Sequence, residues 1–192
     1  MKKEVINIYS SGYNRLFWGM VFILFHINIG YITILPSFIA YLFIYSGLNI
    51  LSSQHEAYKK LKLIVIILIL LSLKDIFYNS ATNFLSAQFY VLSLSSLIDI
   101  VSGILNLYLI YTILNTIYEL CKARALNKTI DNVVDSFTFY FITSLIILFF
   151  IPFSLNLTRD LKLLIIIPAI FKFIASVIIA GIFRRCRLLL KE

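Results

Sequence analysis

Charged residues are scarce in this sequence, and their scarcity decides the class of protein. Only 14% of the 192 residues are charged, whereas 61% are hydrophobic. Soluble domains carry about 25% charged residues and roughly 45 to 50% apolar ones. The composition therefore excludes an ordinary soluble domain and predicts an integral membrane protein. From its length, we expect residues 1–192 to form a single transmembrane domain.

Cysteine and histidine are also rare. The two cysteines, Cys121 and Cys186, are too few for a disulfide framework, and we expect free reduced thiols. The segment HEAYK at residues 55–59 has Lys59 where the zinc-protease motif HExxH has its second histidine. A G-x-S-x-G elbow, a Walker loop and a paired carboxylate motif are all missing. We therefore expect no metal, no cofactor and no enzymatic activity.

Long apolar runs occupy most of the chain. A helix needs about 20 apolar residues to cross a hydrocarbon core of roughly 30 Å. The first two runs are almost continuous and together too long for one crossing, and Pro36 is the expected break between them. An alternative makes residues 16–52 a re-entrant pair that turns back inside the membrane. The expected crossings are residues 16–33, 36–52, 61–80, 89–118, 133–153 and 161–183.

The basic residues lie mainly between these runs, which supplies a prediction of topology. Lysine and arginine accumulate in cytoplasmic loops, so an even number of crossings should separate each cluster from the next. This predicts an all-α polytopic bundle of six helices, arranged as three hairpins, with both termini cytoplasmic. The net charge of +8 is then explained by anionic lipid headgroups rather than by nucleic acid. The four clusters are Lys2, Lys3 and Arg15; Lys59, Lys60 and Lys62; Lys122, Arg124 and Lys128; and Arg184, Arg185, Arg187 and Lys191.

One local signal predicts a helix start in the cytoplasm. Ser53 is followed three residues later by Glu56, the spacing of a capping box. We therefore expect the third helix to begin at about Gln54.

Polar residues inside the fourth crossing follow one face of the expected helix. Polar groups in lipid are costly and tend to face the interior of a bundle. At 100° per residue, Gln88, Ser95, Asp99, Ser102 and Asn106 fall within about 40° of one another. Such a stripe predicts either a functional cavity or simple packing between helices.

The outer end of the third crossing has a similar polar side that includes Asp75, Asn79 and Asn83. Because the third and fourth crossings are consecutive, these side chains are expected to meet the stripe across a short outer turn. Together they would form a water-filled vestibule. Asp75 follows Lys74 directly, so a solvated ion pair between these two neighbours is the alternative interpretation.

One cation and one histidine complete the candidate site. Lys172 lies near the middle of the last crossing, where it could pair with Asp99 and lock two helices together or form the floor of a binding site. His26 lies near mid-membrane in the first crossing. The candidate substrate-binding or ion-binding residues are Asp99, Lys172, Asp75, Asn79, Asn83, Gln88, Ser95, Ser102, Asn106 and His26.

Two functional classes fit these features. The first is small-solute or ion transport, including the membrane-embedded binding subunit of a larger transporter. In size and number of crossings the chain is similar to the substrate-binding subunits of energy-coupling-factor vitamin transporters, although their small-xxx-small alanine motif is missing from the first crossing. The second class is a non-transporting scaffold or accessory subunit, held by its basic loops to anionic lipid or to a protein partner.

The stretch HINIGYITILPSFIAYLFIYSGLNILS, residues 26–52, resembles the first hairpin of small, uncharacterised multi-span membrane proteins of low-GC Gram-positive bacteria. This chain has Ser37 and Ala40 where that pattern has an acidic residue and a glycine. The resemblance implies a bacterial cytoplasmic membrane, and it assigns no activity.

Overall fold

The computed structural model describes the backbone of residues 2–25, 28–29, 32–33, 37–76, 94–153, 164 and 166–190. Within these residues the fold consists of α-helices apart from one 3-10 helix and one very short hairpin. The prediction of an all-α protein is therefore confirmed. The helices are α1 (Lys2–Leu24), α2 (Ser37–Leu51), α3 (Glu56–Ser72), η1 (Leu73–Ile76), α4 (Leu94–Ala123), α5 (Asn127–Phe153) and α7 (Ile166–Leu189), and the strands are β1 (Asn28–Ile29) and β2 (Ile32–Thr33).

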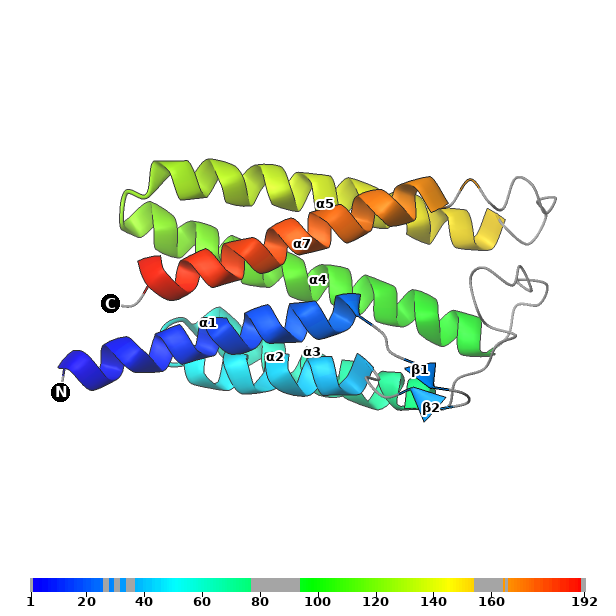
Figure 1. Ribbon diagram of the computed structural model, residues 1–192, viewed down its shortest axis with the longest axis horizontal. Helices are drawn as coiled ribbons and strands as arrows, with labels where there is room; N and C mark the ends of the chain where they lie inside the picture. Colours follow the sequence, from blue (N-terminus) through cyan, green and yellow to red (C-terminus); the bar gives the residue numbers. More distant parts are fainter. Residues whose placement is uncertain are drawn as a thin grey trace.

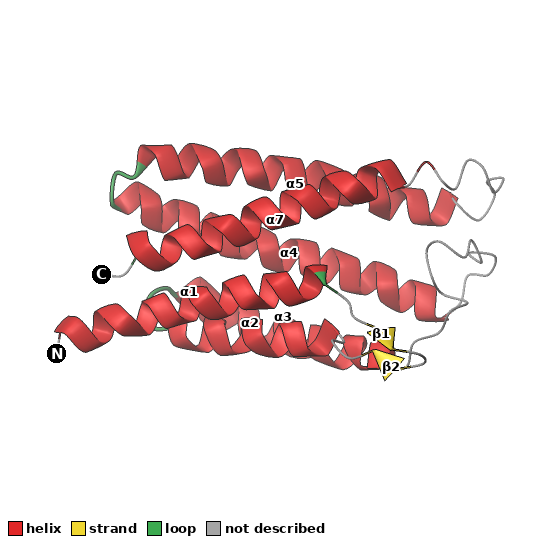
Figure 2. Cartoon of the chain, viewed as in Figure 1, coloured by secondary structure: helices red, strands yellow, loops and turns green. Residues whose placement is uncertain are grey.

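The helices run side by side in an up-and-down bundle, each packed mainly against its neighbours in the chain (Figure 1). The last helix, α7, packs against both α5 and α1, so the first and last helices are joined. Both termini lie at the same end of the bundle, together with the α2–α3 and α4–α5 connections, and β1 and β2 lie at the opposite end (Figures 1 and 2). The four basic clusters are therefore gathered at one end, which we call the basic end.

The first crossing differs from its predicted bounds of 16–33. The helix α1 begins much earlier, at Lys2, and ends at Leu24. Beyond it, Asn28 pairs with Thr33 and Ile29 with Ile32 in an antiparallel ladder. The helical prediction is therefore wrong for Asn28–Ile29 and Ile32–Thr33. Isoleucine and threonine are branched at Cβ, which disfavours helix and suits strands, so apolar content alone gave the wrong structure here.

The start of α3 also differs from the sequence prediction. The N-cap is His55, whose Nδ1 accepts a hydrogen bond from the Ala57 backbone N–H at 3.2 Å. The Ser53 hydroxyl instead donates backwards to the Ile50 carbonyl at 3.1 Å. The predicted capping box is therefore wrong, because a histidine two residues further on supplies the acceptor that the first turn needs.

Three glycines bring α1 and α2 into close contact. A Cβ placed on Gly19 would lie 2.5 Å from Ile44 Cγ1 and 3.0 Å from the Ala40 carbonyl oxygen. A Cβ on Gly47 would lie 2.9 Å from the carbonyl oxygen of Gly12. Small residues at such positions let helix backbones approach closely, which is how helices pack in lipid. This close contact fixes the α1–α2 hairpin that leads to the candidate site.

The connection between α4 and α5 is a short, well-defined turn. The Leu126 N–H donates to the Cys121 carbonyl at 3.0 Å, and the Ala125 N–H donates to the Lys122 carbonyl at 3.2 Å. Ala125 has a φ of 54°, the left-handed conformation that usually holds glycine at this position. The chain therefore reverses within a few residues, and α4 and α5 lie antiparallel.

The outer surface of the bundle is apolar. The helices α4, α5 and α7 are each long and apolar enough to cross a membrane, and only 22%, 28% and 33% of their most apolar windows are buried. Large apolar side chains such as Val101, Ile142, Phe149, Ile170 and Ile174 are exposed instead. Exposing such a surface to water is unfavourable, whereas the hydrocarbon core of a membrane is a favourable environment for it. The structure thus supports a membrane protein.

Candidate functional site

The candidate site is a pocket between α2, α3 and α4 at the end of the bundle away from the termini. It has a volume of about 150 Å³. Three helices contribute because α2 begins, α3 ends and α4 begins at this end (Figure 1). The residues lining it are Ser37 and Tyr41 of α2, Leu68, Leu71 and Ser72 of α3, Lys74 of η1, and Asp99, Ser102, Gly103 and Asn106 of α4.

Two of the lining residues, Lys74 and Asp99, form a partly exposed ion pair. Lys74 Nζ lies 2.6 Å from Asp99 Oδ1, and the two side chains are 28% and 54% exposed. Lys74 reaches α4 because it follows α3 directly, in the 3-10 turn of η1. Exposed ion pairs are worth only about 0 to 1 kcal/mol, so a competing cation could displace the ammonium group at little cost.

Asn106 lies deeper in the pocket, about two turns of α4 beyond Asp99. Its Nδ2 donates to the Tyr140 hydroxyl of α5 at 3.2 Å. Its Oδ1 is buried and has no hydrogen-bond partner in the described part of the chain. An unsatisfied buried acceptor costs about 1 to 3 kcal/mol, which a water, a cation or a ligand N–H could recover. Asn106 therefore brings a buried acceptor without a partner to the wall of the pocket.

Lys172 lies elsewhere, and the predicted pairing with Asp99 is wrong. Lys172 Nζ sits 5.9 Å from the centre of the Tyr140 ring, in a cation–π arrangement. The reason is the order of the helices, because α7 packs against α1 and α5, whereas α3 packs beside α4. Lys172 is connected to the pocket only indirectly, through Tyr140 and Asn106.

The remaining predicted residues divide into three groups. Asp99, Ser102 and Asn106 line one pocket, as neighbours on the same face of α4. Asp75 lies in η1 beside Lys74, and Ser95 lies in the first turn of α4, one turn before Asp99. The others lie outside the described residues: Asn79, Asn83, Gln88 and His26.

The candidate site residues did not include four of the polar lining residues, namely Ser37, Tyr41, Ser72 and Lys74. Ser37 and Tyr41 are one turn apart at the start of α2, directly after Pro36, and this spacing would have indicated a polar face. Lys74 was assigned to the outer end with Asp75 as its neighbour. Its position two residues beyond α3, opposite the start of α4, was the signal for a partner across the turn.

A second polar cluster holds the basic end together. The Tyr13 hydroxyl donates to Gln54 Oε1 at 2.9 Å and lies 3.3 Å from the Tyr58 hydroxyl. Gln54 Nε2 donates in turn to the Leu190 carbonyl at 3.2 Å, which joins the end of α7 to the α2–α3 connection. Burial raises the pKa of both tyrosines, which precede the apolar runs of α1 and α3. These hydrogen bonds and the burial of both tyrosines indicate that the cluster stabilises the fold.

His55 connects the α2–α3 turn to α4 at the same end. Its Nε2 lies 3.4 Å from Glu119 Oε2, while its Nδ1 caps α3. Asn115 Nδ2 donates to the other oxygen of Glu119 at 3.2 Å. Among the described residues, no group of three or more histidine, cysteine, aspartate or glutamate side chains is arranged to hold a metal ion.

Comparison of the chain with protein-family models, with curated proteins and with solved structures finds no match in any of the three. The site is therefore interpreted from its own geometry.

Proposed function

We propose that this chain is a multi-pass protein of a bacterial cytoplasmic membrane, with six crossings and both termini in the cytoplasm. The collection of the basic clusters at the end that holds both termini supports this orientation. The 15-residue α2 is an apolar helix without a charged residue, and the 17-residue α3 continues into η1, which lengthens its path toward the opposite end. The resemblance of residues 26–52 to the first hairpin of small membrane proteins of low-GC Gram-positive bacteria supports the bacterial assignment.

We further propose that the pocket between α2, α3 and α4 binds a small cation or a small polar solute for transport, alone or as the binding subunit of a larger transporter. The observation that carries this proposal is the buried, unpartnered Oδ1 of Asn106, a residue that lines a pocket also lined by the carboxylate of Asp99. Asp99 and Asn106 supply acceptors, and the hydroxyls of Ser37, Ser72 and Ser102 can accept as well. Acceptors of this kind suit a cation or a solute rich in N–H and O–H groups.

The size of the pocket limits the ligand. Water occupies about 30 Å³ per molecule in the liquid, so about 150 Å³ holds a few waters or a solute of similar size. Drug-sized ligands need roughly 300 Å³ or more. We therefore expect an inorganic cation, a small amine or a compact polar metabolite, which replaces the Lys74 ammonium at Asp99 on binding.

A thermal-shift screen of the detergent-purified protein tests this function. Inorganic cations, small amines, amino acids and vitamins are added to the wild type and to Asp99→Asn. A ligand present at 100 times its Kd should stabilise the wild type by about 2.7 kcal/mol. That stabilisation should disappear in Asp99→Asn and persist in the matched control Asp131→Asn, an exposed carboxylate of α5 near the basic end.

A second variant tests the exchange with Lys74. Lys74→Gln removes the competing ammonium, so a cationic ligand should bind up to about fivefold more tightly, the equivalent of an exposed ion pair. Lys172→Gln should leave the affinity unchanged. If no compound shifts the wild-type midpoint, or if the shift survives in Asp99→Asn, the pocket is not a binding site and the alternative of a scaffold or accessory subunit is favoured.

A further inference from the structure

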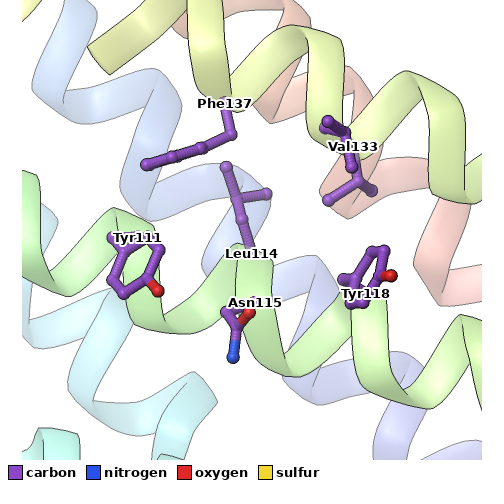
Figure 3. Close-up of a pocket in the computed structure, with 7 residues that line it drawn as sticks. Tyr111, Leu114, Asn115, Tyr118, Val133 and Phe137 are labelled. Atoms are coloured by element: carbon purple, nitrogen blue, oxygen red, sulfur yellow. The ribbon is translucent and has the colours of Figure 1, made fainter.

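A groove between α4 and α5 lies in the half of the bundle nearer the basic end, far from the pocket described above. Its volume is about 210 Å³. Figure 3 shows the Tyr111 and Tyr118 rings at its two ends, with Leu114 between them and the α5 side chains across from it. Most of the residues that form its walls are apolar or aromatic, and one is an amide: Tyr111, Leu114, Asn115 and Tyr118 of α4 and Val133, Val134 and Phe137 of α5.

The groove opens outward, onto the apolar surface that faces lipid. Leu114 and Val133 are buried and form its floor, whereas Tyr111 and Val134 are 45% and 46% exposed at its rim. Tyr111 and Tyr118 are seven residues apart, about 10 Å along the helix axis. One leaflet of hydrocarbon is about 15 Å thick, half of the bilayer core. The groove thus has the length, direction and apolar walls that suit one acyl chain.

Two lysines lie where the headgroup of such a lipid would be. Lys122 follows Tyr118 by four residues and Tyr111 by eleven, which places it on the same face of α4 as the groove. It is exposed, as is Lys128 in the first turn of α5. The short turn at Ala125 holds the two helix ends together. The groove therefore ends in fixed positive charge.

The nearby carboxylates do not cancel this charge. Glu119 is engaged by His55 and by Asn115. Asp131 is exposed one turn into α5, and the same connection carries three basic residues, Lys122, Arg124 and Lys128. A lipid whose phosphate carries a net negative charge, with no amine in the headgroup to cancel it, would therefore bind here more tightly than a neutral lipid. Each lysine near a membrane surface strengthens the binding of anionic lipid about fivefold, equivalent to about 1 kcal/mol.

We propose that the α4–α5 groove binds an anionic phospholipid, with one acyl chain between Tyr111 and Tyr118 and the phosphate at Lys122 and Lys128. This site is separate from the proposed solute pocket and does not depend on it.

Native mass spectrometry of the protein in detergent, titrated with phosphatidylglycerol or with phosphatidylcholine of the same acyl chains, tests the proposal. The wild type should retain phosphatidylglycerol in preference to phosphatidylcholine. Lys122→Gln should weaken that binding about fivefold. Val134→Trp fills the groove from its exposed rim, without altering the buried core, and should weaken the binding of both lipids. The matched control is Lys59→Gln, which removes an exposed lysine of the same end outside the groove and should bind as the wild type does.

Three results would overturn the proposal. The first is equal retention of the two lipids by the wild type. The second is binding by Val134→Trp that equals the wild type. The third is a loss in Lys59→Gln as large as that in Lys122→Gln, which would indicate diffuse attraction to the whole basic end. Circular dichroism and size-exclusion profiles that match the wild type establish that each variant is folded.

Discussion

Tyr13 and Tyr58 form a buried polar contact at the basic end. Their hydroxyls lie 3.3 Å apart, both side chains have no exposed surface, and Tyr13 also donates to Gln54. Burial disfavours the phenolate and raises the pKa of both groups above the ordinary value of 10.0. Each tyrosine therefore stays protonated in the folded protein under conditions in which an exposed phenol would ionise.

This shift predicts a loss of stability in alkali. Below the unfolded-state pKa of tyrosine, both states are protonated and the folded protein keeps its full stability. Above that pKa, the unfolded chain releases protons that the folded chain retains, so unfolding becomes more favourable. The free energy of unfolding should fall as pH rises above 10, by up to about 1.4 kcal/mol per pH unit for each tyrosine. Thermal midpoints measured from pH 8 to pH 11 check this.

The variant Tyr58→Phe provides the comparison. It should show a smaller fall above pH 10 than the wild type and a constant offset between pH 8 and pH 9, where neither tyrosine ionises. A fall of the same steepness in Tyr58→Phe would mean that other groups cause the alkaline loss.

Single residues also show where sequence reasoning fails. Asp99 was identified from its position on a polar stripe, but its partner was not. Lys172 lies near the middle of the last apolar run, yet the structure pairs Asp99 with Lys74. An ion pair depends on which helices are neighbours in space, and the helical wheel of one segment carries no such information.

At the level of elements, the close contact of α1 with α2 depends on glycine. Gly47 lies against the backbone of α1 at the Gly12 carbonyl, and Gly19 lies against Ile44 and the Ala40 carbonyl. A backbone atom cannot move aside as a side chain can. By contrast, a Cβ on Gly181 in α7 would meet nothing within 4 Å.

Two alanine substitutions should therefore have opposite effects. Gly47→Ala should destabilise the protein by about 1 to 3 kcal/mol, because it overpacks the contact between α1 and α2. Gly181→Ala should be neutral or stabilising by up to about 1 kcal/mol, the difference in helix propensity. Thermal midpoints in the same detergent measure both. Equal destabilisation by the two variants would contradict the tight α1–α2 contact.

The ends of the elements were harder to predict than their existence. All six apolar runs overlap helices in the described part of the chain, because sustained apolar content is a strong signal. The start of α3 depends on one hydrogen bond to His55, and the end of α1 depends on a change to paired strands. Such boundaries are decided by single interactions that compete closely with their alternatives.

For the whole molecule, the arrangement of charge predicts the orientation in the membrane. Both termini and the connections at residues 52–55 and 124–126 lie at the basic end, and the start of α7 lies at the other. If the basic end is cytoplasmic, a cysteine placed there should be protected in intact cells from a thiol reagent that does not cross membranes. The native Cys121 and Cys186 are free and buried.

Two variants, each with one added cysteine, test this orientation. Lys128→Cys should be labelled only after the membrane is permeabilised, whereas Leu164→Cys, exposed before α7, should be labelled in intact cells. Both variants should be labelled in detergent, which shows that each thiol is accessible. The reverse pattern would place the basic end outside, and protection of both in intact cells would contradict the crossing of the last hairpin.

The sequence by itself determined that the chain is apolar and helical, that its basic residues fall between the apolar runs, and that Asp99, Ser102 and Asn106 share one helical face. These properties are local, because composition and a period of 3.6 residues require no knowledge of neighbours. Only the tertiary structure decided that η1 brings Lys74 to Asp99 and that Tyr140 lies between Asn106 and Lys172. It also decided that α4 and α5 enclose a groove. Each of these depends on helix packing, where the order and rotation of the helices select one set of contacts among many that the same apolar surfaces allow.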